Sequence, residues 1–430
     1  MLTEITIQQG TRIALVDLLF AWPPNGGADV DLYHVAKELS EQGIPLTLFV
    51  VQFEGIAGRG QVCPADLPFP VELISIPKNT KHHHAITARI RNAVDAWKPN
   101  AVFLTHGYAL KAHVALALAH YPLISRYYAH ELLCARNAHR FKENAPCSFN
   151  YFSHPQECRQ CALTHLRSEI KSHERQAWAQ DYLAAEAYQK EYYITAGKAL
   201  DAMTCIIVSN ETLKLELGEY QHKAVVIPGG IDTPQAIQEQ EKPATHTKTI
   251  YMAGRVDDPL KGLDVLLEAN TLLKKKRNDF QVVATHFDPR LSKGNFVATG
   301  WLSHKEALQY YAAADICVVP SIWQEPFGLV AVEAMAAGLP VCASHIGGLR
   351  DIVVHGETGY LFPPGDPVAL ADFLDTLLTD SALRATLGAA GRKRALSLYT
   401  WKNIVKKHYL PLLKDILVQS HTNKGMQPHE

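Results

Sequence analysis

Short apolar runs alternate with helix-spaced segments along almost the whole chain of 430 residues. Runs rich in branched and aromatic side chains predict strands, and segments with apolar residues three and four positions apart predict helices. In the first half the expected strands are residues 12–20, 45–51, 71–76, 101–105, 123–128, 205–208 and 225–227, and the expected helices are 29–41, 85–97 and 110–120. This alternation is typical of right-handed βαβ units, which build a parallel sheet covered by helices on both faces.

A polar segment divides this pattern into two series. Residues 233–248 carry Pro234 and Pro243 and have no periodic apolar pattern, so we expect a linker there. The second series has expected strands at 249–252, 281–284, 315–319 and 339–343, and an expected helix at 263–276. We therefore predict an α/β protein with two doubly wound, Rossmann-like domains that face each other across a cleft, since such sheets bind ligands beyond the carboxyl ends of their strands.

The predicted domain boundaries follow from these two series. The N-terminal domain is residues 1–235, the linker 236–248 and the C-terminal domain 249–400, and a helix at 401–430 follows. Residues 130–203 depart from the alternation, because they are first rich in Cys and His and then helical over a long stretch. We interpret them as an insertion in the N-terminal domain.

Composition limits the partners and the location that we expect. The formal net charge is −1, without the basic excess that is typical of nucleic-acid-binding proteins. No segment approaches the ~20 consecutive apolar residues that span a membrane. We therefore expect no nucleic-acid partner and a cytoplasmic location. The basic run 274–277 either caps a helix end or contacts an anionic membrane surface at its inner face.

The segment 321–341 is the most informative part of the sequence. Glu325 and Glu333 are eight positions apart, which is a little over two helical turns, so the first precedes a helix and the second lies inside it. Main-chain N–H groups at a helix start bind anions, and here they belong to Phe327, Gly328 and Leu329. A carboxylate within an apolar helix needs a partner or a polar ligand such as ribose hydroxyls. Capping therefore does not account for Glu333.

This segment resembles the Glu-(seven residues)-Glu motif of the family 4 retaining glycosyltransferases, which have the GT-B fold. The resemblance extends over residues 226–401 and includes Gly254-Arg255 with Lys261-Gly262, Gly347-Gly348 with Gly356 to Asp366, and residues 295–302. In the family these elements grip the donor diphosphate, form the loop after the motif and flank the nucleobase. The set of motifs is specific, whereas each motif alone is weak.

The resemblance implies a site without a required metal cofactor, because two cations can neutralise a diphosphate. The residues expected to act in catalysis are Arg255, Lys261, Glu325 and His106. The residues expected to bind the nucleotide-sugar, of UDP or GDP type, are Gly27, Arg255, Lys261, Glu325, Phe327, Gly328, Leu329 and Glu333. Asp257-Asp258, followed by Pro259, is interpreted as a turn and not as a metal site.

Three positions in the N-terminal half follow predicted strands, where doubly wound sheets place function. Gly26-Gly27 follows the first strand, and in similar proteins that loop closes over the donor phosphate, although a plain turn is the alternative. His106 follows the fourth strand and resembles a family histidine that contacts the donor sugar. His130-Glu131 resembles a position near the acceptor. The fingerprint Gly-x-Gly-x-x-Gly and the P-loop are absent from the sequence, which argues against a dehydrogenase or an NTPase.

Four of the eight cysteines crowd into the insertion, at Cys134, Cys147, Cys158 and Cys161. A close Cys-x-x-Cys pair with two further thiols suits a structural Zn²⁺, but the first two spacings are irregular for a zinc ribbon. Unliganded thiols and a disulfide or redox role remain open.

The sequence thus predicts a retaining glycosyltransferase that moves a hexose-type sugar from a nucleotide-sugar to a hydroxyl of a saccharide or lipid-linked acceptor. The expected setting is the assembly of cell-surface polysaccharide, lipopolysaccharide or glycolipid. The alternatives are a GT-B nucleotide-sugar epimerase or hydrolase, glycosylation of a small-molecule metabolite, and a non-catalytic subunit that binds sugar nucleotides.

Overall fold

The computed structural model describes residues 10–24, 26–54, 61–77, 80, 82–134, 136, 140–142, 145–172, 189–232 and 247–424. The chain folds into two compact units. The first unit comprises Met1–Arg140, Cys147–Pro228 and Ile404–Glu430, and the second comprises Phe141–Pro146 and Gly229–Asn403. The predicted linker at 236–248 falls almost entirely on residues outside the described part of the chain.

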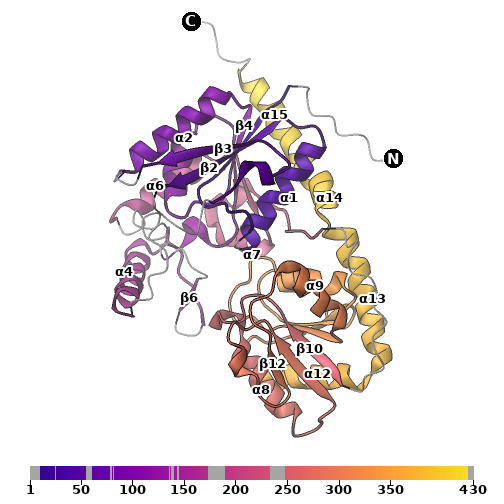
Figure 1. The fold of residues 1–430 in the computed structure, drawn as a ribbon. Coiled ribbons are helices and arrows are strands. Elements are labelled where there is room, and N and C mark those ends of the chain that lie inside the picture. The colour runs from indigo at the N-terminus through magenta and orange to yellow at the C-terminus, as the bar shows by residue number, and fades with distance from the viewer. Residues whose placement is uncertain are drawn as a thin grey trace, which may run out of the picture. The chain divides into compact units, whose positions relative to one another are not determined.

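A seven-stranded parallel sheet forms the centre of the first unit, in the order β3-β2-β1-β4-β5-β8-β9 (Figure 1). Its strands are β1 (Ile13–Asp17), β2 (Leu46–Phe53), β3 (Val71–Ile76), β4 (Ala101–Leu104), β5 (Leu123–Arg126), β8 (Cys205–Val208) and β9 (Ala224–Val226). The apolar side chains of β1 and β4 are buried, as expected for central strands covered on both faces. The strand order reverses between β1 and β4, so the carboxyl ends of these strands form the switch point where doubly wound sheets bind ligands.

Helices cover this sheet in two layers. The helices that pack on it include α1 (Gly27–Glu41), α2 (His83–Trp97), α3 (Leu110–Ala117), α6 (Tyr192–Ala202) and α7 (Glu211–Glu216). α2, α3 and α6 pack side by side in one layer, whereas α1 packs with the C-terminal helical segment. That segment consists of α14 (Trp401–Ile404), a π-helical turn (Val405–Tyr409) and α15 (Leu410–Lys424), which Figure 1 shows in yellow. Within it the buried Tyr409 packs against Phe103 of β4.

The second unit contains a six-stranded parallel sheet in the order β12-β11-β10-β13-β14-β15. Its strands are β10 (Lys248–Met252), β11 (Phe280–Ala284), β12 (Phe296–Ala298), β13 (Ile316–Val319), β14 (Val341–Ser344) and β15 (Gly359–Phe362). Its helices are α8 (Leu263–Leu273), α9 (His304–Ala313), α10 (Leu329–Ala336), α11 (Leu349–Ile352), α12 (Pro367–Thr379) and α13 (Ser381–Leu398).

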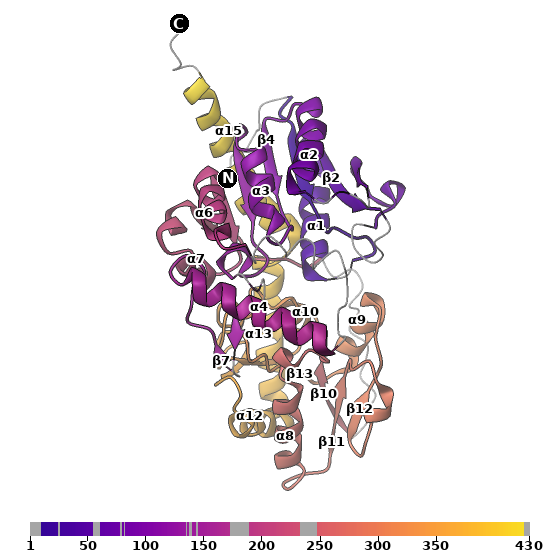
Figure 2. The same cartoon turned by 90° about the vertical axis from the view of Figure 1, so that its left-hand side faces the viewer.

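Alternate residues of these strands belong to two separate cores, as the period of two along a strand requires. Ile316 and Val318 of β13 pack in the core beneath α8 and α12, which lie side by side in Figure 2. Cys317 and Val319 pack in the opposite core with α10 and α13. The predicted α/β class with two Rossmann-like parallel sheets is confirmed.

The predicted insertion contains a hairpin of β6 (Phe141–Lys142) and β7 (Ala145–Pro146), followed by α4 (Pro155–Ser172). Residues 173–188 of the predicted helical stretch lie outside the described residues. α6 packs against α3 and leads into β8, so it acts as the ordinary crossover helix between β5 and β8.

Candidate functional site

The loop after β10 carries both predicted phosphate-binding cations. Gly254 begins the turn with φ +97°, and Asp258 caps the short 3₁₀ turn Pro259–Lys261 by accepting a hydrogen bond from Leu260 N at 3.0 Å. Asp258 therefore shapes the turn, as the sequence predicts. The Arg255 carbonyl accepts a hydrogen bond from Asp258 N at 3.1 Å, but its exposed side chain makes neither a hydrogen bond nor an ion pair within the described residues. Its guanidinium is available to a ligand.

Lys261 and Glu325 are brought together by the carboxyl ends of β10 and β13. Lys261 Nζ donates to both carboxylate oxygens of Glu325, at 3.0 and 2.9 Å. Ser321 Oγ donates to Glu325 Oε2 at 2.9 Å, and the ammonium lies 5.3 Å from the centre of the Trp323 ring. The side chains of Lys261 and Glu325 are 22% and 13% exposed, so the ion pair is largely shielded from water yet reachable. A bound anion would compete with Glu325 for this ammonium.

Glycines hold these loops in main-chain contact. A Cβ at position 262 would lie 2.0 Å from Pro320 O, and a Cβ at position 347 would lie 2.3 Å from Glu325 O. Ile322 N donates to Leu260 O at 2.9 Å, and Gly348 N donates to Glu325 O at 2.7 Å. No side chain fits at either glycine without displacing the backbone that carries Lys261 or Glu325.

The start of α10 presents unpaired donors beside this ion pair. Gly328 is the N-cap residue with φ +113°, and its conformation turns the chain from the Glu325 loop into the helix. Within the described residues, no acceptor binds the main-chain N–H groups of Phe327, Gly328 and Leu329. Together with the helix dipole, these groups favour a negatively charged ligand.

Glu333 lies within α10 and has a protein partner that the sequence did not predict. Tyr311 Oη of α9 donates to Glu333 Oε2 at 3.1 Å, and His304 Nδ1 lies 3.7 Å from Oε1. Burial raises the pKa of Glu333, and His304 and Tyr311 only partly offset this rise. The side chain is 15% exposed, so it is mostly but not fully buried.

The loop after β11 is joined to the Gly254 loop and to the loop after β12, whose Gly300 N donates to His286 O at 2.9 Å. Thr285 Oγ1 donates to Gly254 O at 2.6 Å, and His286 Nε2 lies 3.0 Å from Asp257 Oδ1. Two exposed aromatic side chains stand on these loops, Phe287 at 64% and Trp301 at 68% exposure. The loops at the carboxyl ends of three neighbouring strands, β10, β11 and β12, are thus linked by hydrogen bonds.

Two predicted site residues belong to the first unit. Gly27 is the first residue of α1, and nothing lies within 4 Å of a Cβ placed there. Packing against the described residues therefore does not require glycine at this position. His106 is partly buried and follows β4, and its ring lies between Tyr108 and Tyr128, at centroid distances of 5.4 and 5.8 Å.

His130 and Glu131 are buried in contacts within the first unit. Glu131 pairs with Lys111 and accepts a hydrogen bond from Tyr128 N at 2.9 Å. His130 Nδ1 and Arg140 Nη1 lie 2.8 and 2.7 Å from the same oxygen of Glu216. Burial alone raises the pKa of Glu216, but these two neighbours hold it below its usual value. The pair His130-Glu131 therefore anchors the segment after β5.

The four insertion cysteines are neighbours, and none of them forms a disulfide within the described residues. Burial raises the pKa of the Cys158 thiol to about 12, and the charges of Cys134, Cys147 and Cys161 add to this rise. The donor set suits Zn²⁺. However, no three His, Cys, Asp or Glu side chains are arranged as a metal-binding group anywhere in the described parts of the chain. The zinc site stays a prediction.

Three functional neighbours were missed by sequence reasoning. Ser321 and Trp323 lie within the segment 321–341, only four and two positions before Glu325, and this short spacing could have indicated them. Tyr311 precedes Glu333 by 22 positions on another helix, and nothing in the sequence connects the two residues.

Comparison with known proteins shows which families this chain resembles. Residues 234–394 match the family model described as "Glycosyl transferases group 1". Phosphatidyl-myo-inositol mannosyltransferase of Mycobacterium leprae is 32% identical over 213 residues, which are 47% of this chain and 56% of that protein. The chain spans about half the length of the curated relatives it matches.

Solved structures show the same fold over nearly the whole chain. Sucrose-phosphate synthase from Thermosynechococcus elongatus aligns with a TM-score of 0.64 at 20% identity, over 95% of this chain and 100% of that one. Anabaena Alr3699/HepE in complex with UDP and glucose aligns with a TM-score of 0.65 at 18% identity, over 94% and 99%. Residues 234–394 thus resemble the group 1 glycosyltransferases, and the chain has the GT-B fold of two Rossmann-like domains.

Proposed function

We propose that the chain is a family 4 retaining glycosyltransferase, which transfers a hexose from a UDP- or GDP-sugar to a hydroxyl of a saccharide or lipid-linked acceptor. The observation that carries this proposal is the meeting of Lys261, Glu325 and the start of α10 within the family-matched segment. An ammonium and free helix N–H groups suit a diphosphate, and carboxylates suit the hydroxyls of sugar and ribose.

In the proposed mechanism this chain stabilises the charge that grows on the departing phosphate. Lys261, Arg255 and the N–H groups at Phe327–Leu329 bind the diphosphate, so no divalent ion is required. Glu325 accepts from hydroxyls of the transferred sugar, and Glu333 accepts from the ribose. Transfer proceeds with retention through an oxocarbenium-like transition state, in which the departing phosphate takes the proton of the incoming hydroxyl.

Two relatives support the substrate classes. The Anabaena structure contains UDP and glucose, and the name of the Mycobacterium leprae protein describes a mannosyl transfer to an inositol lipid. In our proposal residues 249–400 bind the donor, residues 1–235 bind the acceptor and the helix at 401–430 returns to the acceptor domain. Gly27 and His106 contact the donor from that domain.

We place the reaction in the cytoplasm at the inner face of the membrane, in the assembly of polysaccharide, lipopolysaccharide or glycolipid. Within the described residues no helix is long and apolar enough to cross a membrane. Contact with the membrane in this proposal is therefore peripheral.

The test begins with a panel of UDP-, GDP- and ADP-sugars, screened by the thermal stabilisation that a true donor produces through mass action. The stabilising donor is then incubated with saccharide and lipid-linked acceptors, with and without EDTA, and the anomeric configuration of the product is read by NMR. We expect a retained configuration and transfer that EDTA leaves unchanged.

Other outcomes separate the alternatives. Release of free sugar without an acceptor indicates a hydrolase, and a changed sugar on the nucleotide indicates an epimerase. Donor binding without any turnover indicates a binding subunit and contradicts the proposal.

A further inference from the structure

A buried carboxylate at the carboxyl end of β1 joins the two strand-end loops of the first unit. Asp17 is 2% exposed, and its Oδ1 accepts hydrogen bonds from Leu19 N at 2.7 Å and Phe20 N at 2.6 Å. Its Oδ2 accepts from Thr105 Oγ1 at 2.6 Å and from His106 N at 3.0 Å. One side chain therefore binds the loop that leads to Gly26-Gly27 and the loop that carries His106.

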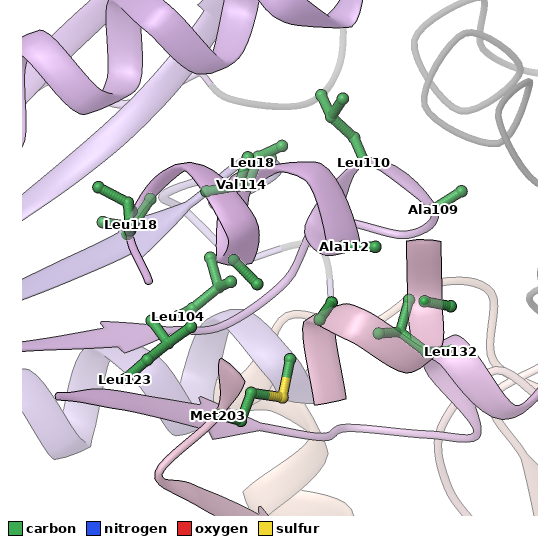
Figure 3. Packing of buried hydrophobic residues seen from close by; sticks show 14 of the residues in the cluster. Leu18, Leu104, Ala109, Leu110, Ala112, Val114, Leu118, Leu123, Leu132 and Met203 are labelled. Carbon is green, nitrogen blue, oxygen red and sulfur yellow. The ribbon is translucent and has the colours of Figure 1, made fainter. Parts of the chain in front are cut away.

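The two loops also touch directly. Leu18 N donates to His106 O at 3.0 Å, and Leu18 Cδ1 lies 3.1 Å from a Cβ placed on Gly107. The Leu18 side chain is 1% exposed and belongs to the same apolar cluster as Val114 of α3, part of which Figure 3 shows. The start of the loop after β1 is thus fixed both by this apolar contact of Leu18 and by the hydrogen bonds from Leu19 N and Phe20 N to Asp17.

The chain geometry beside His106 needs such support. Tyr108, two residues further on, has φ +47°, a left-handed conformation that bulky residues rarely adopt and that persists only where surrounding contacts enforce it. Asp17 accepts four hydrogen bonds, three from main-chain N–H groups and one from the hydroxyl of Thr105. A carboxylate accepts four such bonds, whereas an amide turns an N–H₂ toward two of the donors.

We propose that Asp17 is a positioning residue for the transfer reaction: it holds His106 and the loop before Gly27 in one fixed arrangement. This role rests on the proposed function. Both carboxylate oxygens are occupied by protein donors, so Asp17 acts through its neighbours and touches no substrate. Misplacing reacting groups by about 1 Å can cost about 10²-fold in rate, so the effect falls on turnover.

The first arm of the test measures kinetics. Asp17→Asn should lower kcat by about 10²-fold while the KM for the donor changes less than about twofold, because the proposed donor-binding residues lie mostly in the second unit. Thr105→Val, which removes the hydroxyl, should lower kcat in the same direction, and Thr105→Ser should restore it. Ile90→Val, a core substitution in the middle of α2, controls for a general loss of stability.

The second arm needs no activity. In hydrogen exchange, the amides of Leu19, Phe20 and His106 should lose protection together in Asp17→Asn, exchanging about tenfold faster, while amides of the second unit remain unchanged. UDP should raise the melting temperature of this variant as it does that of the wild type.

Each result decides the proposal. A kcat for Asp17→Asn close to that of the wild type, a fall no larger than that of a stability-matched Ile90→Val, or retained protection of the three amides overturns the role of Asp17. These results leave the proposed function intact, because they do not affect sugar transfer by the wild type. A wild-type chain that binds donor but transfers no sugar overturns the proposed function and this role with it.

Discussion

Glu333, which we propose binds the ribose, has a buried carboxyl, and we expect the protein to become more stable when this carboxyl is neutralised. Burial raises the pKa of Glu333, so the folded protein keeps this proton to a higher pH than the unfolded chain does. Its contribution to stability is present below the ordinary carboxyl pKa of about 4.5 and is lost as the pH rises through the folded value. Above the folded pKa, each unit of difference between the folded and unfolded pKa lowers the free energy of unfolding by about 1.4 kcal/mol.

Glu333→Gln removes this cost while keeping the size of the side chain. The amide oxygen still accepts the hydrogen bond from Tyr311 Oη. We expect a higher free energy of unfolding than that of the wild type at pH 7 to 8, and each kcal/mol gained should raise the melting temperature by about 2–4 °C for a unit of this size. The difference should close as the pH falls toward 4.5.

The same variant should lose its response to donor. At a UDP concentration of 100 times Kd the wild type gains about 2.7 kcal/mol. Losing a hydrogen bond to a charged carboxylate removes about 1.5–3 kcal/mol of affinity, so the gain at that concentration falls to about 0.3–1.3 kcal/mol.

Thermal melts from pH 4.5 to pH 8, with and without UDP, measure both effects. Glu357→Gln, at an exposed carboxyl of the same unit, controls for the change in net charge. A Glu333→Gln variant that is less stable than the wild type at neutral pH refutes the electrostatic reasoning. An undiminished response to UDP refutes the assignment of Glu333 to the ribose.

Three further predictions concern the site and the insertion. Lys261→Ala should lower turnover by about 10²-fold or more, because it removes a principal cation from the phosphate site, and steady-state kinetics near the wild type contradict that assignment. Gly262→Ala should lower the melting temperature strongly, because its Cβ meets Pro320 O at 2.0 Å, whereas Gly356→Ala has the same sign of φ and an open surrounding and should cost less. Metal analysis of protein purified without added metal should find about one zinc per chain, lost in a Cys158→Ser and Cys161→Ser double variant; protein without stoichiometric zinc has free thiols instead.

The fold was largely predictable because both sheets are parallel and buried, so their strands are near-continuous apolar runs. The predicted strand at 12–20 nevertheless extends past the observed end of β1 at Asp17. Leu18, Leu19 and Phe20 are as buried as the strand itself, but the N–H groups of Leu19 and Phe20 turn back to the Asp17 carboxylate. Hydrophobicity reports burial, and a buried loop has the same signal as a strand.

Local spacing predicts one part of the candidate site, and the family resemblance adds Arg255 and Lys261, which stand far from Glu325 in the sequence. Glu325 and the start of α10 follow from local spacing. The partner of Glu333 depends on how α9 packs against α10, and such tertiary contacts leave no trace in one sequence. Gly27 was predicted from its residue type and its place after a strand, yet no described residue crowds a Cβ at that position.

The main-chain packing at Gly262 and Gly347 has a consequence for how this chain can diverge. At these glycines main-chain atoms pack directly against main-chain atoms, so no larger residue fits there. The loops that carry Lys261 and Glu325 therefore cannot change by small steps in side-chain size. Phe287 and Trp301, by contrast, stand exposed on the adjoining loops and can be replaced without disturbing that frame. Variation in donor preference is therefore expected to accumulate on these loops, while the geometry around the ion pair stays constant.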